Sequence, residues 1–146
     1  MADKVAIVAD SIACLTREQV EQYGITIAPI PISFQGKIYR DWVDITPSEA
    51  YEFFLQDPGS FKTAGASPGI FLEAYRQASK QAHNILCLTL SARLSGACEA
   101  ASTAITGNSP SDVNRGANTL PSSMSLISSG AGKAVSVNGT GQSALR

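Results

Sequence analysis

The chain has 146 residues, a net charge of −1 and a hydrophobic fraction of 44%, enough apolar material for one domain with a buried core. Its 11 Lys and Arg residues form no basic cluster, so we expect no nucleic-acid partner. Every aromatic residue lies at or before Tyr75, whereas Ser, Gly and Asn make up almost half of residues 107–146. We therefore predict a globular domain over residues 1–106 and a disordered, low-complexity tail over residues 107–146.

The cysteines and the apolar runs indicate a cellular location. Cys14, Cys87 and Cys98 are odd in number and widely spaced, which fits neither a disulfide framework nor a zinc site. The first apolar run ends at Asp10, too early for a signal peptide, and no other run is long enough to cross a bilayer. We predict a reduced, cytoplasmic protein that makes only transient membrane contact.

The first elements predict a β-α-β unit. Residues 4–9 form a continuous apolar run typical of a buried parallel strand, and Asp10 and Ser11 follow it directly. A capping box at residues 16–19 begins a helix that Gly24 ends, and residues 25–30 form the next strand.

A hairpin and a second helix are expected next. Residues 32–34 and 37–39 flank a polar turn in which Gly36 supplies a positive φ. A second capping box at residues 46–49, with Pro at the first helical position, begins a helix that runs to about Leu55.

The remaining elements complete an α/β pattern. A helix begins at Ser67-Pro68, and its apolar stripe consists of Ile70, Phe71, Ala74, Tyr75 and Ala78. Residues 84–90 form a second strongly apolar strand, and residues 97–105 form a helix of small residues. The sequence therefore predicts an α/β fold with a mostly parallel sheet flanked by helices.

Two hydroxyl-bearing turns, at residues 62–69 and 91–96, stand where we expect a strand to pass into a helix. Together with Asp10 and Ser11 they make three such transitions, which should meet at the carboxyl edge of one sheet. Helix N-termini at this edge bind anions, and hydroxyl groups add further donors. These turns predict a site that holds a small anion rather than one that transforms it.

Catalytic alternatives have less support. His83 lies just before a strand, on the far side from the hydroxyl turns, with no acid or nucleophile placed to orient it. Asp10, Asp41 and Asp44 match no metal loop and are expected to be caps and turn carboxylates. The glycines match neither nucleotide-binding pattern, so we predict no cofactor and no metal. A small α/β enzyme acting on a phosphate or acyl ester remains an alternative.

Four segments, in this order, carry a family resemblance. They are VAIVADSIACL (5–15), QYGITIAPIPISFQGKIYRDWVDITPSEAYEFF (22–54), KTAGASPGIFLEAY (62–75) and LTLSARLSGACEAA (88–101). Together they resemble the N-terminal half of the DegV family, the fatty-acid-binding proteins of bacterial fatty-acid kinase systems. The resemblance runs from Val5 to Ala104, and we find none after Ala104.

The resemblance implies a non-catalytic carrier with a two-domain α/β fold. Such a protein buries one long-chain fatty acid and presents its carboxylate to a separate ATP-dependent kinase, which makes an acyl phosphate. Thr63 and Ser95 match the residues that contact the carboxylate in the family, and Asp10 and Ser11 match an Asp-Ser pair at the same edge. Ser67 is expected only to cap a helix.

The chain also departs from the family pattern. Ala64 and Gly65 replace bulkier or polar residues, and Arg93, at the possible edge of the site, stands where the family has a small residue. The family's second domain is expected to be absent. A truncated or frameshifted fragment without function is therefore an alternative to the lipid carrier.

Overall fold

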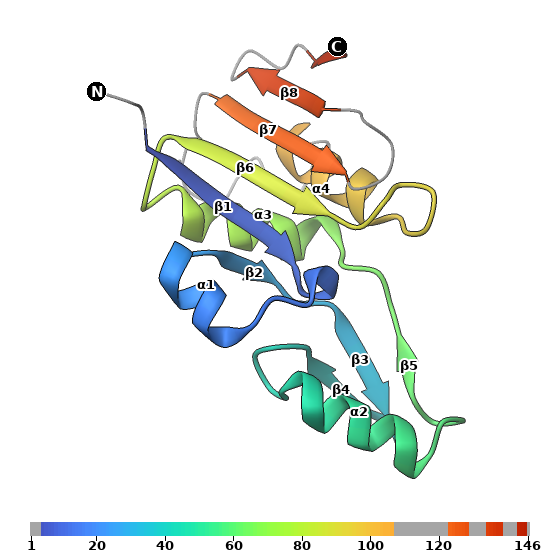
Figure 1. Cartoon of the computed structure of the whole chain (residues 1–146). Helices are drawn as coiled ribbons and strands as arrows, with labels where there is room; N and C mark the ends of the chain where they lie inside the picture. Colours follow the sequence, from blue (N-terminus) through green and yellow to red (C-terminus); the bar gives the residue numbers. More distant parts are fainter. Residues whose placement is uncertain (1–3, 107–122, 129–133, 139–142, 146) are drawn as a thin grey trace.

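The computed structural model describes residues 4–106, 123–128, 134–138 and 143–145, which form two sheets and their helices (Figure 1). The elements in chain order are β1 (Val5–Asp10), η1 (Ser11–Ala13), α1 (Arg17–Tyr23), β2 (Thr26–Ala28), β3 (Pro31–Phe34), β4 (Lys37–Arg40), α2 (Pro47–Gln56), β5 (Lys62–Thr63), α3 (Pro68–Ala78), β6 (Asn84–Thr89), α4 (Ala97–Thr106), β7 (Ser123–Ser128), β8 (Ala134–Asn138) and β9 (Ser143–Leu145).

The larger sheet has the strand order β2-β1-β6-β7-β8-β9. The pairs from β2 through β7 are parallel, with Val8 opposite Thr26 on β2 and opposite Cys87 on β6. The last two pairs, β7 with β8 and β8 with β9, are antiparallel. The predicted α/β fold with a mostly parallel sheet is therefore confirmed.

Helices α3 and α4 pack on one face of this sheet (Figure 1). Val8 on β1 and Cys87 on β6 are buried beneath them, whereas Leu86 and Leu88 on the opposite face of β6 are only half-buried. On α3 the predicted apolar stripe faces inward, and Tyr75 is fully buried. The core thus lies between the sheet and the α3–α4 layer.

The smaller sheet has the order β4-β3-β5 and is antiparallel. Helix α2 packs on it through Phe53, whose ring stacks on Phe34 at a centroid distance of 4.5 Å and contacts Tyr39 at 5.3 Å. Thr63 pairs with Ile32 in this sheet. The expectation that the turn at residues 62–69 follows a strand of the parallel sheet is therefore wrong, because the main chain there pairs with β3 instead.

The helix ends follow the sequence signals. Both capping boxes are present, with Thr16 paired to Gln19 and Thr46 paired to Glu49. Gly24 ends α1 with a φ of 61°, a conformation that costs glycine little. Ser67 occupies the N-cap position of α3 as expected, but its side chain makes no capping hydrogen bond.

Strands β7, β8 and β9 all come from the segment predicted as a tail. Residues 124–127, a short apolar stretch within this otherwise polar segment, lie in β7, which continues the parallel sheet beyond β6. The rest of the predicted tail lies outside the described residues, so the boundary at residue 106 stays a prediction.

The described helices are all short. The longest, α3, has 11 residues, and none in the described part of the chain combines the length and apolar character needed to span a membrane.

Candidate functional site

Asp10 and Ser11 lie where β1 ends, and both side chains are buried. The Oδ2 atom of Asp10 accepts a hydrogen bond from the Leu90 N–H at 2.7 Å, just after β6. The Oγ atom of Ser11 accepts one from the Ile30 N–H at 3.1 Å, just before β3. These two neighbouring side chains therefore bind the main chain on either side of β1.

The Asp10 carboxyl group is in a poor environment for a charge. Burial raises its pKa above the ordinary value of 3.8, and the hydrogen bond from Leu90 acts in the opposite direction. One carboxylate oxygen of Asp10 already accepts a hydrogen bond from a backbone N–H, so this side chain stabilises the local fold. The placement favours a structural role for Asp10 over direct contact with an anionic ligand.

The turn after β6 holds Ser95 at the start of α4. The Ser91 carbonyl oxygen accepts hydrogen bonds from the Leu94 and Ser95 N–H groups at 2.9 and 3.0 Å. The Oγ atom of Ser95 accepts one from the Ala97 N–H at 3.2 Å. A hydroxyl group that accepts one hydrogen bond can still donate its own proton, and Ser95 is half-buried. Arg93 is exposed in the same turn.

Thr63 belongs to the other sheet, where it pairs with Ile32. It is exposed on β5, and the Ala64 N–H that follows it donates to the Pro31 carbonyl oxygen at 3.0 Å. The segment from β5 to α3 and the loop from β6 to α4 both lie on the side toward which β1 and β6 point (Figure 1). The two predicted hydroxyl turns thus lie on the same side of the molecule but follow strands of different sheets.

The residues considered for catalysis lie elsewhere. His83 is exposed immediately before β6, at the amino end of that strand. Asp44 accepts three hydrogen bonds from Arg40, two from the guanidinium group and one from the backbone, and the guanidinium holds the pKa of Asp44 below its ordinary value. Within the described residues, no three His, Cys, Asp or Glu side chains are grouped to hold a metal ion.

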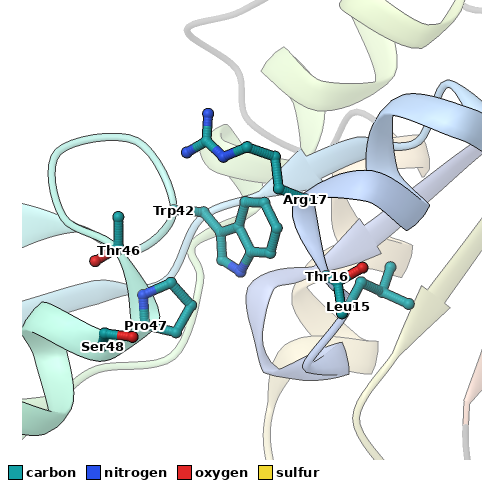
Figure 2. A pocket seen from close by; sticks show the side chains of 7 residues that line it. All are labelled: Leu15, Thr16, Arg17, Trp42, Thr46, Pro47 and Ser48. Atoms are coloured by element: carbon teal, nitrogen blue, oxygen red, sulfur yellow. The ribbon is translucent and has the colours of Figure 1, made fainter.

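The sequence reasoning missed a surface pocket of about 210 Å³ between the first turns of α1 and α2 (Figure 2). It is lined by Leu15, Thr16, Arg17, Trp42, Thr46, Pro47 and Ser48. Trp42 lies centrally among them and has a φ of 70°, unusual for a bulky residue. The adjacent N-caps, Thr16 and Thr46, were visible in the sequence, but nothing there indicated that they meet. None of the five predicted site residues lines this pocket.

A mostly parallel sheet backed by α3 and α4, with the turn at residues 91–96 following β6, defines the class as an α/β protein. The chain belongs to the DegV family, described as uncharacterised proteins, whose model matches residues 4–124. The match continues past Ala104 to the start of β7, so the expectation of no resemblance beyond Ala104 is wrong.

Relatives of known sequence and structure agree with this assignment. A DegV domain-containing protein from Caldanaerobacter subterraneus is 32% identical over 99 residues, covering 68% of this chain and 35% of its own. A stearic-acid-binding protein from Eubacterium ventriosum shows a TM-score of 0.67 at 30% identity, covering 85% of this chain and 41% of its own. A DegV family protein from Thermus thermophilus, described for its fatty-acid binding, shows a TM-score of 0.63 at 26% identity. The match covers 86% of this chain and 40% of the Thermus thermophilus protein. The chain thus spans well under half the length of these relatives.

Proposed function

We propose that this chain is a lipid carrier that binds one long-chain fatty acid and holds its carboxylate at the carboxyl edge of the parallel sheet. The observation that supports this most is the likeness to the Eubacterium ventriosum protein, which binds stearic acid and shares the fold at 30% identity. Thr63 and Ser95 are the proposed donors to the carboxylate. Arg93, which is exposed in the same turn as Ser95, is proposed to add a positive charge.

The acyl chain and the hydroxyl groups contribute differently. A hydrogen bond to a charged group contributes roughly 1.5 to 3 kcal/mol, whereas each buried methylene contributes about 0.8 kcal/mol. A long acyl chain therefore dominates the attraction, although ordering it offsets part of the gain. In this proposal Thr63 and Ser95 set the orientation of the carboxylate more than the affinity.

The proposal includes a separate, cytoplasmic kinase as partner. A carboxylate oxygen of the bound fatty acid attacks the γ-phosphorus of ATP, and the bond to the β-phosphate oxygen breaks, giving an acyl phosphate and ADP. This chain supplies no catalytic group in that step. Its part is to keep the carboxylate accessible to the kinase while the acyl chain is covered.

Native mass spectrometry of the complete chain with stearate, and separately with methyl stearate, tests the carrier function. We expect a one-to-one stearate adduct on the compact charge states and weaker retention of the ester, which has no charged oxygen. A compact protein without any stearate adduct would contradict the proposal. An unfolded charge-state distribution would instead support the fragment without function.

A further inference from the structure

We propose that Asp10 and Ser11 form a clamp, defined by these two residues, that fixes the positions of Thr63 and Ser95 relative to each other. The inference rests on the function proposed above, since it concerns the same carboxylate site. It assigns Asp10 and Ser11 a positioning role that requires no contact with the fatty acid.

The first arm of the clamp leads to Ser95. Asp10 Oδ2 accepts from the Leu90 N–H at 2.7 Å, across 80 positions of sequence. Ser91 follows directly, and its carbonyl oxygen accepts from the Ser95 N–H at 3.0 Å. The start of the Ser95 turn is therefore tied to the end of β1, and the turn's own hydrogen bond holds Ser95 relative to that start.

The second arm leads to Thr63. Ser11 Oγ accepts from the Ile30 N–H at 3.1 Å, and Pro31 follows directly as the first residue of β3. The Pro31 carbonyl oxygen accepts from the Ala64 N–H at 3.0 Å, one residue after Thr63. A second main-chain segment, carrying the other hydroxyl, is thus tied to the residue next to Asp10.

The clamp matters because the two hydroxyl groups belong to different sheets. Thr63 is on β5 of the small sheet, whereas Ser95 follows β6 of the large one. Among the hydrogen bonds described above, those of Asp10 and Ser11 lead from the end of β1 to both segments. Both side chains are nearly inaccessible, at 2% and 5% exposure, so solvent competes little for these bonds.

Amide hydrogen exchange of the complete chain, read by NMR, tests the two arms separately and without ligand. In Asp10→Ala we expect faster exchange, by roughly tenfold or more, at Leu90 and Ser95 with Ile30 and Ala64 unchanged. In Ser11→Ala we expect faster exchange at Ile30 and Ala64, with Leu90 and Ser95 unchanged. Faster exchange at all four amides in either variant, or at none of them, would overturn the clamp. If the alanine variants fail to fold, Asp10→Asn and Ser11→Cys weaken the acceptors and should give the same crossed pattern at smaller size, while Ser11→Thr restores protection.

Ligand binding provides the second readout. In the native background and in Thr63→Ala, Asp10→Ala should weaken stearate binding by no more than Ser95→Ala does, roughly threefold. In Ser95→Ala it should have hardly any effect, because the hydroxyl group that Asp10 positions is then already missing. Methyl stearate binding should change little throughout. Equal losses of stearate affinity in Thr63→Ala and in Ser95→Ala would overturn the positioning role. If the unmodified chain binds no stearate, the proposed function fails, and the crossed exchange pattern alone then decides whether the clamp exists.

Discussion

The Tyr75 hydroxyl group on α3 donates a hydrogen bond to the Ala101 carbonyl oxygen on α4 at 3.1 Å, in a fully buried position. This bond joins the two helices that cover the sheet, and burial raises the pKa of Tyr75 well above its ordinary value. We expect Tyr75→Phe to keep the packing and lower the free energy of unfolding by about 1 kcal/mol, because it removes only the hydrogen bonds of the hydroxyl group, to the Ala101 carbonyl oxygen and to the Cys87 thiol. Urea unfolding measures this difference.

Tyr51 provides the matched control. It lies on α2 with 61% of its surface exposed, so Tyr51→Phe removes a hydroxyl group that water already solvates. Its free energy of unfolding should stay within about 0.5 kcal/mol of the original. Equal effects of the two substitutions would mean that the Tyr75 bond adds nothing to stability.

The β3–β4 hairpin turns through two residues with positive φ, Gln35 at 47° and Gly36 at 79°. Glycine adopts this conformation freely, whereas a side chain at Gly36 would be strained, even though an added Cβ has open space there. We expect Gly36→Ala to lower the free energy of unfolding by about 1 kcal/mol. Thermal unfolding followed by circular dichroism measures the change.

The adjacent position should respond in the opposite direction. Asn tolerates a left-handed backbone better than Gln, so Gln35→Asn should raise the free energy of unfolding by a few tenths of a kcal/mol. If both substitutions change stability in the same direction, backbone strain is not what limits this turn.

Local signals in the sequence predicted local structure well. The capping boxes at Thr16 and Thr46, the stop at Gly24 and the turn at Gly36 each depend on a few neighbouring residues, and each is present. Placement in space was harder to predict. Whether Thr63 joins the parallel sheet or pairs with Ile32 depends on a partner strand about 30 positions earlier, and a two-residue strand has no periodicity of its own.

The same reason explains what was missed at the site. The sequence indicated that Asp10 and Ser11 end a strand, but the backbone groups they bind, at Leu90 and Ile30, carry no side-chain signal. The Trp42 pocket forms because two helix starts meet in space, which composition and spacing do not encode.

The capping box of α2 should make stability depend on pH. Glu49 accepts hydrogen bonds from the Thr46 N–H at 2.7 Å and from its hydroxyl group at 2.9 Å, and these bonds lower the pKa of Glu49 below its ordinary value of 4.5. A carboxyl group whose pKa is lower in the folded state stabilises the fold above the unfolded value. That contribution is lost as the pH falls through the folded value.

The measurement compares the original chain with Glu49→Gln by urea unfolding between neutral pH and about pH 3. The difference in the free energy of unfolding between the two proteins should be fully developed above pH 4.5. It should vanish below the pKa that Glu49 has in the folded state. The box of α1 gives the reciprocal test, since Gln19 has the same position there. Gln19→Glu should introduce the same pH dependence, and a difference that is constant with pH in both helices would contradict this account.

The proposed carrier function predicts that loss of one hydroxyl group harms phosphorylation more than binding. Thr63→Ala and Ser95→Ala should each lower stearate affinity only modestly, by roughly three- to tenfold, since the acyl chain dominates the attraction. Acyl-phosphate formation by the kinase at saturating stearate should fall further, because a carboxylate held by one donor is less well oriented toward ATP. Ser67→Ala is the control, as Ser67 is exposed and its side chain makes no capping hydrogen bond. Parallel losses of affinity and of phosphorylation would mean that Thr63 and Ser95 contribute to binding alone.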